Sequence, residues 1–217
     1  MWFIIIYFEF KEKYFKKLIK LINIEYQNKI IYPNKHDILN FLRLTPFKNI
    51  NTIIIGQDPY CKKGQAHGLA FSVRENIQIP GSLKNIFKEL HNDIGVNNLN
   101  KHGNLNAWAK QGVFLLNSIL TVEENNPGAH SKFGWEKFTD KIIQKLSNNK
   151  KKLIFVLLGK YASNKLELIN IQKHITIITS HPSPMSANNG FLGSRIFSKV
   201  NINLKLINDT IKIKWDI

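Results

Sequence analysis

The sequence has one cysteine, Cys61, among its 217 residues. A single thiol excludes an internal disulfide, a zinc site built from several cysteines and a cysteine-ligated iron–sulfur cluster. Long apolar runs are also missing. The apolar start at residues 2–8 ends at Glu9, and no basic residues stand before it. It is too short to span a membrane and lacks the layout of a signal peptide. These absences predict a protein of a reducing compartment, the cytoplasm, without a membrane partner.

Acidic residues are scarce: 15 Asp and Glu accompany 31 Lys and Arg, and the formal net charge is +16. Such an excess suits a polyanionic partner, either nucleic acid or an acidic membrane surface. The abundance of Lys, Ile and Asn is also what an AT-rich genome produces by itself. The charge therefore supports nucleic acid without establishing it. The length and a hydrophobic content of 43% indicate one globular domain over residues 1–217.

Four apolar runs predict buried β-strands, because none of them alternates with polar residues. Helix-compatible segments separate the runs, as crossovers between parallel strands require. The pattern predicts an α/β protein with three layers, α/β/α, around a central four-stranded parallel sheet. The runs are residues 53–55 before Gly56, residues 113–116 before Asn117, residues 153–158 before Gly159, and residues 175–179 before Ser180.

Helical spacing fills the segments around these runs. Residues 1–50 predict an N-terminal helical segment beside the first strand, ahead of the chemistry-bearing motifs in residues 53–217. Ser82 is a predicted N-cap of an amphipathic helix, and residues 161–171 are predicted to form the last crossover helix. Helical spacing resumes after the fourth strand and ends near Trp215.

Polar side chains follow three of the predicted strands. Asp58 stands in a stiff Asp-Pro loop after the first run, Asn117 ends the second, and His181 follows the fourth. Each one alone is more often a structural residue than a functional one. In a parallel sheet, however, the three converge on the carboxyl edge, where ligands bind. An acid, an amide and an imidazole meeting there form a candidate active site.

Several motifs resemble those of family 1 uracil-DNA glycosylases, in the family's order and from about Tyr32 to Trp215. The resemblance implies a uracil-DNA glycosylase-like fold. The motifs are the water-activating tract Gly56-Gln57-Asp58-Pro59-Tyr60 with residues 64–73, the uracil-reading strand at residues 115–122, the DNA-intercalating loop His181-Pro182-Ser183-Pro184-Met185-Ser186, and matches at residues 80–83 and 134–140.

The family resemblance implies hydrolysis of the N-glycosidic bond of deoxyuridine in DNA. Free uracil is released and an abasic site remains, which is the first step of base excision repair. The target base must leave the stack and enter a pocket before it can react. The implied enzyme is a monomer without lyase activity, metal or other cofactor, and its partner is uracil-containing single- or double-stranded DNA.

The resemblance also implies a role for each matching residue. Asp58 positions the attacking water and stabilises the sugar cation, while His181, acting as a neutral imidazole, hydrogen-bonds the uracil oxygen that gains negative charge. Asn117 reads the pyrimidine edge, since a planar amide carries both an acceptor and donors. The remaining implied contacts are Phe71 stacking on uracil, Tyr60 excluding the thymine methyl, Gln57 contributing its loop backbone beside uracil, Ser82, Ser183 and Ser186 gripping DNA phosphates, and Met185 as the apolar wedge.

The chain departs from the family pattern at four positions. Cys61 stands where a His follows the Tyr, which puts the water-side network in question. Gly81 and Asn34 each replace a proline, and Ile196 stands where a His is common.

Two other functions are compatible with parts of the sequence. A DNA-binding protein that has lost catalysis suits the net charge and the departures, but it has no need of Asp58, Asn117 and His181 together. A hydrolase using Ser183 with His181 lacks a strand-to-helix nucleophile elbow around the serine.

Overall fold

A computed structural model of the chain describes residues 2–209 and 211–217. No helix among these residues is long and apolar enough to cross a membrane. The elements are α1 (Trp2–Lys11), α2 (Lys13–Asn28), β1 (Ile31–Tyr32), the 3-10 helix η1 (Lys35–Asp37), α3 (Asn40–Leu44), η2 (Phe47–Asn49), β2 (Thr52–Gly56), α4 (Gly81–Ile94), α5 (Asn106–Lys110), β3 (Val113–Asn117), β4 (Val122–Glu123), α6 (Trp135–Asn149), β5 (Ile154–Leu158), α7 (Lys160–Ser163), η3 (Asn164–Leu168), β6 (Ile175–Thr179), η4 (Ala187–Asn189) and α8 (Ile196–Ile207).

The central sheet has the strand order β3-β2-β5-β6, and all neighbouring strands are parallel. Every residue of β2, β3 and β5 is buried, which is why their sequences do not alternate. β6 lies at an edge and is only partly buried, with Ile178 half exposed. The predicted four-stranded parallel sheet is therefore confirmed.

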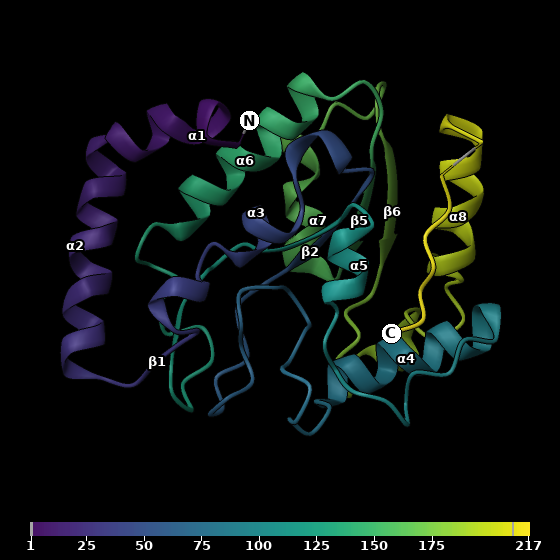
Figure 1. The fold of residues 1–217 in the computed structure, drawn as a ribbon, viewed down its shortest axis with the longest axis horizontal. Coiled ribbons are helices and arrows are strands. Elements are labelled where there is room, and N and C mark those ends of the chain that lie inside the picture. Colours follow the sequence, from purple (N-terminus) through teal and green to yellow (C-terminus); the bar gives the residue numbers. More distant parts are fainter. Residues whose placement is uncertain (1, 210) are drawn as a thin grey trace.

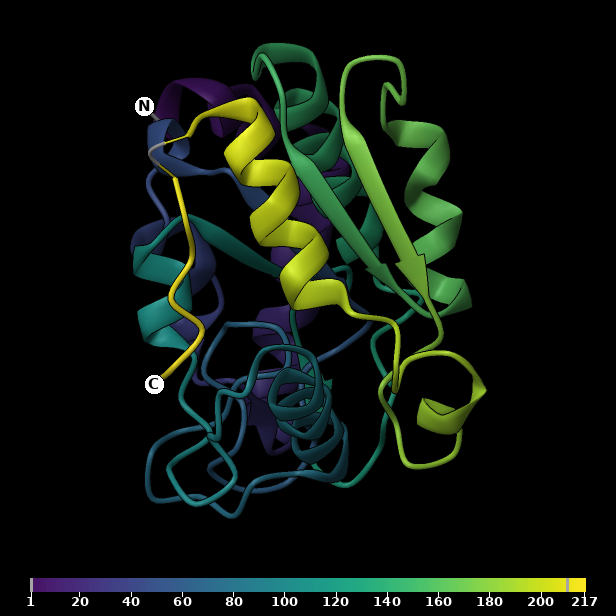
Figure 2. The ribbon, with the colours of Figure 1, turned by 90° about the vertical axis from the view of Figure 1, so that its right-hand side faces the viewer.

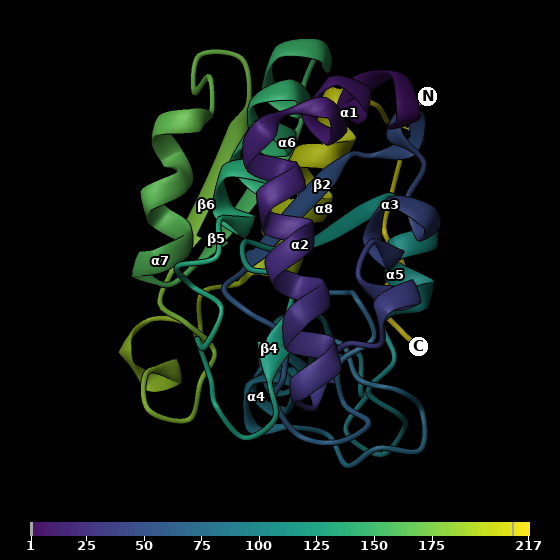
Figure 3. The ribbon, with the colours of Figure 1, turned by 90° about the vertical axis from the view of Figure 1, so that its left-hand side faces the viewer.

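Helices cover both faces of this sheet. Figure 1 shows α8 to one side of β6, with α6 and α7 on the other side. Seen from the α8 side, that helix lies on the near side of the sheet, next to β5 (Figure 2), and from the opposite side α2 and α6 lie in front of the sheet (Figure 3). α1 and α2 form an outer cover, since Phe10 and Phe15 pack against Phe138 of α6. The three-layer prediction is confirmed.

Two predictions about helices are wrong. Residues 161–171 do not form one helix but divide into α7 and the 3-10 helix η3. The tighter turn carries Lys165 inward, where its Nζ lies 2.8 Å from a carboxylate oxygen of Asp140. The last helix ends at Ile207, well before Trp215. The Trp215 carbonyl accepts a hydrogen bond from the indole of Trp108, so this tail is anchored without being helical.

The chain forms a second, two-stranded sheet that was not predicted from the sequence. β1 and β4 pair antiparallel, with Ile31 opposite Glu123 and Tyr32 opposite Val122. Each strand has two residues, too few to produce a periodic signal. This ribbon joins the end of the N-terminal helical segment to the polar loop that follows β3.

Candidate active site

A cavity of about 570 Å³ opens at the carboxyl ends of the parallel strands. β2 and β3 end side by side, because Gly56 pairs with Asn117, and β6 ends two residues before His181. The sequence prediction that the carboxylate, the amide and the imidazole converge at this edge is confirmed by their common cavity. The cavity-lining residues among those named from the sequence are Gln57, Asp58, Tyr60, Cys61, Phe71, Gly81, Ser82, Asn117 and His181.

The amide of Asn117 occupies space that only a glycine leaves free. Asn117 is 7% exposed, and a Cβ placed on Gly56 would overlap with its Oδ1 atom. The same Cβ would lie 3.1 Å from the Cβ of Ala70 and 3.4 Å from the ring of Phe71. The glycine therefore lets a planar donor–acceptor group lie over the end of β2, at the bottom of the cavity.

The carboxylate of Asp58 is held by a backbone donor from the loop that follows β4. The N–H of Gly128 donates to its Oδ2 atom at 2.8 Å. Burial raises the pKa of Asp58, and the hydrogen bonds from the N–H groups of Gly128 and Asp58 itself partly oppose this rise. The carboxylate is an acceptor with further lone pairs, which can receive hydrogen bonds from a water molecule.

The loop that carries Gly128 is fixed at its base by buried polar groups. The indole of Trp135 donates to the hydroxyl of Thr121 at 2.6 Å, and this hydroxyl lies 2.7 Å from Nδ1 of His130. Because the hydroxyl oxygen already accepts from Trp135, its own proton can go to His130. The imidazole stacks on Phe133 with ring centroids 4.4 Å apart. These contacts hold residues 121–133 in a defined shape.

The N-terminal segment holds the same loop from outside. The N–H of Glu124 donates to the carbonyl of Ile30 at 2.9 Å, and the hydroxyl of Tyr32 donates to the Glu124 carboxylate at 2.6 Å. Lys29 lies 3.2 Å from Glu123. The loop is thus bound both to α6 and to the chain that precedes η1.

His181 presents one defined nitrogen to the cavity. Its Nδ1 accepts a hydrogen bond from the N–H of Ser183 at 3.0 Å, so a neutral imidazole carries its proton on Nε2. Burial lowers the pKa of His181, which favours this neutral form. The imidazole can therefore donate one hydrogen bond from Nε2 at neutral pH without first losing a proton.

Phe71 is held in a strained backbone conformation beside His181. Its φ of 63° lies in the left-handed region, which costs a residue other than glycine about 1–2 kcal/mol. The Tyr60 hydroxyl donates to the Phe71 carbonyl at 3.3 Å, and the Phe71 and His181 rings lie 5.9 Å apart at an angle of 42°. These contacts fix the ring of Phe71 as an aromatic wall of the cavity.

The loop after His181 is held together by its own serines. Ser186 donates its hydroxyl proton to the His181 carbonyl at 2.8 Å, and its oxygen lies 2.8 Å from the hydroxyl of Ser183. Met185, between them, is 94% exposed. The loop therefore projects one large apolar side chain into solvent from a hydrogen-bonded base.

The same contacts bear on the hydrolase alternative. His181 uses Nδ1 for the backbone N–H of Ser183 and not for the hydroxyl. The Ser183 hydroxyl pairs with Ser186 instead. An activated serine gives its proton to a neighbouring base, and this arrangement does not provide that contact.

Ser82 and Gly81 lie where α4 meets the cavity. The prediction of Ser82 as N-cap is wrong, because α4 begins at Gly81 with Pro80 in the cap position. A Cβ on Gly81 would lie 2.7 Å from Cγ of Pro184. The glycine that replaces a family proline therefore allows the Met185 loop to pack closely on the start of α4.

Cys61 and Gln57 line the cavity, and both accept a hydrogen bond through the backbone carbonyl. The Cys61 carbonyl accepts the N–H of Asn125 at 2.9 Å, and the Gln57 carbonyl accepts the N–H of Ile119 at 2.9 Å. The thiol of Cys61 is partly exposed and lines the cavity. Among the described residues, the Cys61 thiol makes no hydrogen bond that could take the place of one from the histidine that the family pattern has here.

Comparisons with known proteins agree with this geometry. A family model described as "Uracil DNA glycosylase superfamily" matches residues 43–205. The chain belongs to this superfamily. A uracil-DNA glycosylase of Blochmanniella floridana is 51% identical over 205 residues, which cover 94% of this chain and 92% of the relative. One of Campylobacter jejuni is 51% identical over 210 residues, covering 96% and 90%.

The solved structures include members of the superfamily with the same fold. The crystal structure of mimivirus uracil-DNA glycosylase superposes with a TM-score of 0.94 at 32% identity, covering 100% of this chain and 86% of that one. At 16% identity, a structure from Nitratifractor salsuginis shares the fold alone, with a TM-score of 0.62.

Proposed function

We propose that this chain hydrolyses the N-glycosidic bond of deoxyuridine in DNA, releasing uracil and leaving an abasic site, the first step of base excision repair. One observation carries the proposal. A single cavity holds the carboxylate of Asp58, the amide of Asn117 and the imidazole of His181. In its neutral form this imidazole carries its one nitrogen-bound proton on Nε2. Superfamily membership over residues 43–205 and relatives named uracil-DNA glycosylase support the same activity.

The proposal assigns recognition of the base to the cavity floor and walls. A uracil flipped out of the stack would lie against Phe71, where stacking is worth about 1–3 kcal/mol. Asn117 would read its edge through one acceptor and one donor. Tyr60 would occupy the space that the methyl group of thymine requires, so that thymine is rejected by a clash. The backbone at Gln57 would lie beside the base.

The reaction separates charge, and the two catalytic residues would stabilise its two ends. As the bond breaks, the sugar becomes cationic and the uracil becomes anionic. Asp58, held by the Gly128 N–H, would stabilise the cation and accept a hydrogen bond from the attacking water. His181 would donate from Nε2 to the uracil oxygen. Removing such a donor typically costs about 2.7–4 kcal/mol of transition-state stabilisation.

DNA binding is assigned to the rim of the cavity. Ser82, Ser183 and Ser186 would contact the phosphates, which fixes the register without reading sequence. Met185, 94% exposed, would enter the duplex where the base has left, as apolar wedges do in other proteins. We further propose that residues 1–217 act as one domain, as a cytoplasmic monomer on single- and double-stranded DNA, without a metal.

The test is uracil release from a single-stranded oligonucleotide in excess chelator, followed by alkaline scission of the abasic product. Strands containing thymine or cytosine serve as controls, and Asp58→Asn is the inactive comparison. We expect scission only at uracil and a nearly complete loss in the variant. Tight DNA binding with intact strands would favour the non-catalytic DNA-binding function, and a strict metal requirement would contradict the cofactor-free mechanism.

The Asp58→Asn variant is also a sound folding control. The pKa of Asp58 is raised in the folded protein. Its contribution to stability is therefore fully present only below the unfolded pKa and is lost as pH rises through the folded pKa. At neutral pH the ionised carboxylate costs folding free energy, so the asparagine variant should melt no lower than the parent.

A further inference from the structure

Helix α4 carries opposite charges on opposite sides. Successive residues of an α-helix are rotated by about 100°, so Lys84 and Lys88 lie on one side, and Glu89 and Asp93 on the other. Both oxygens of each carboxylate accept hydrogen bonds from the segment at residues 193–198. Glu89 accepts the N–H groups of Gly193 and Arg195 at 2.6 and 2.7 Å, and Asp93 accepts the N–H and hydroxyl of Ser198 at 2.8 and 2.5 Å.

The lysine side of α4 borders a second depression, of about 320 Å³, which we name the α4 groove. It borders the active-site cavity, because Gly81 and Lys84 line both. The amide of Asn85 donates to the Pro182 carbonyl at 2.9 Å, which fixes α4 against the Met185 loop. The groove is lined by Gly81, Lys84, Asn85, Lys88, Pro184, Ala187, Asn188 and Leu192.

The charge in the α4 groove is unbalanced. Within the described chain, neither Lys84 nor Lys88 has a carboxylate partner, and no acidic residue lines the groove. By contrast, the buried Lys165 lies between Glu136 and Asp140. Like charges four residues apart destabilise a helix. Two neighbouring lysines at this groove, with Asn85 and Asn188 as further hydrogen-bonding groups, suit a polyanion.

We propose that the α4 groove binds the DNA phosphodiester backbone on one side of the flipped nucleotide, with Lys84 and Lys88 each contacting a phosphate. This inference rests on the proposed function, since the groove begins where the uracil cavity ends. The two lysines are separated by about 6 Å along the helix, against about 3.4 Å of duplex axis per phosphate of one strand. Each lysine can therefore meet its own phosphate. Such contacts position the strand and carry no sequence information.

The proposal is tested through the salt dependence of DNA binding. Fluorescence anisotropy with a uracil-containing duplex would be measured between 50 and 200 mM salt, in the Asp58→Asn background so that the DNA stays intact. Each lost phosphate contact lowers the salt slope by about 0.9. The Lys84→Gln/Lys88→Gln variant should therefore lower it by about 1.8. Over this range the parent should weaken about 12-fold more than the variant.

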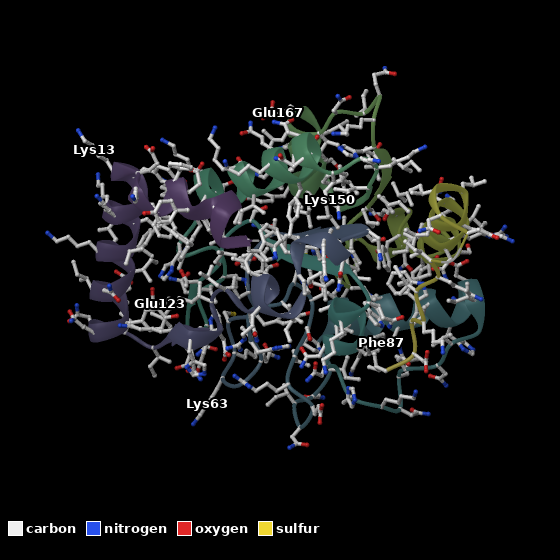
Figure 4. All side chains as sticks on the ribbon, turned by 45° about the horizontal axis from the view of Figure 1, so that its top comes forward. Lys13, Lys63, Phe87, Glu123, Lys150 and Glu167 are labelled. Atoms are coloured by element: carbon white, nitrogen blue, oxygen red, sulfur yellow. The ribbon has the colours of Figure 1, made fainter. Side chains whose placement is uncertain are left out.

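A matched control comes from α2, which lies at the opposite side of the molecule from α4 (Figure 1). Lys16 and Lys20 are likewise exposed and four residues apart, and this helix begins at Lys13, labelled in Figure 4. The Lys16→Gln/Lys20→Gln variant removes the same charge and should leave the salt slope unchanged. Equal slopes for both double variants would overturn the proposal, because the effect would then come from net charge alone.

A second arm locates the contact along the DNA. Duplexes with a long flank on only one side of the uracil would be compared with those extended on the other side. The lysine substitutions should weaken binding to one of these two duplexes. The affinity for the other duplex should equal that of the protein without the lysine substitutions. An equal loss on both overturns the proposal. If DNA binds with the expected slopes but the chain that retains Asp58 releases no uracil, the proposed glycosylase activity fails and the α4 groove remains a DNA-binding site.

Discussion

Replacing Gly56 with alanine tests whether the active site depends on the close approach between the ends of β2 and β3. The backbone of Gly56 does not have a positive φ, so alanine adds a methyl group without forcing the chain. That methyl overlaps with Oδ1 of Asn117, lies at a tight 3.1 Å from Cβ of Ala70, and is in ordinary contact with the ring of Phe71 at 3.4 Å. The amide is therefore the group that has to move.

The expected size of the effect follows from this overlap. To reach an ordinary non-bonded separation, the Asn117 oxygen must withdraw by about 1 Å. A displacement of that size at a reacting centre can cost about 10²-fold in rate. The extra methyl also overpacks a buried strand end, which typically costs about 1–3 kcal/mol of the free energy of unfolding. For a chain of this length, each kcal/mol lowers Tm by about 2–4 °C.

Single-turnover uracil release at saturating DNA measures the rate, and thermal melting shows that the variant is folded. A double-mutant cycle then tests the cause. In an Asn117→Ala background the overlapping oxygen is gone, so Gly56→Ala should cost less than about threefold there. A full 10²-fold loss in both backgrounds would refute the argument, since the methyl would then act through something other than the amide.

Two further outcomes follow from the same site. Burial raises the pKa of Asp58 above 3.8 and lowers that of His181 below 6.5, and the proposed mechanism needs the ionised acid and the neutral imidazole. The single-turnover rate should therefore decline as pH falls, and the His181 imidazole, followed by NMR, should titrate with a midpoint below 6.5. A midpoint at or above 6.5 would contradict a neutral His181. Thr121→Val leaves buried donors and acceptors of Trp135 and His130 unpaired, at about 1–3 kcal/mol each, and should lower both Tm and the rate by loosening the Gly128 loop. Thr121→Ser should restore both, and a lower Tm with an unchanged rate would show that the loop does not position Gly128.

The strands and the polar groups at their ends were predictable because each signal is local. A non-alternating β-branched run followed by Asp-Pro predicts a buried strand ending in a stiff loop, and Asp58 lies there. Parallel pairing then follows from the long segments between the runs. Asn117 could be placed opposite Gly56 only once the register was known, since a shift by one residue would turn its side chain away.

The remaining features depend on contacts between distant residues, which sequence patterns do not encode. Gly128 contributes a backbone N–H, which any residue except proline would supply, so only the Pro-Gly turn before Ala129 marks the position. Phe71 was identified by family resemblance, and nothing in its own residue type indicates a left-handed φ. The division of residues 161–171 accompanies an ion pair of Lys165 with Asp140 on a different helix.

The ribbon formed by β1 and β4 changes where the working unit of this protein begins. The family model starts at residue 43, and a reader trimming the chain to its recognisable part would cut there. Such a cut removes Ile30 and Tyr32, and with them the bonds that hold Glu124 in the loop carrying Gly128. Residues 30–32, which lie outside the family-model match, therefore brace the loop that holds the Asp58 carboxylate. The part of the chain that supports Asp58 is thus longer than residues 43–205, which the family model matches.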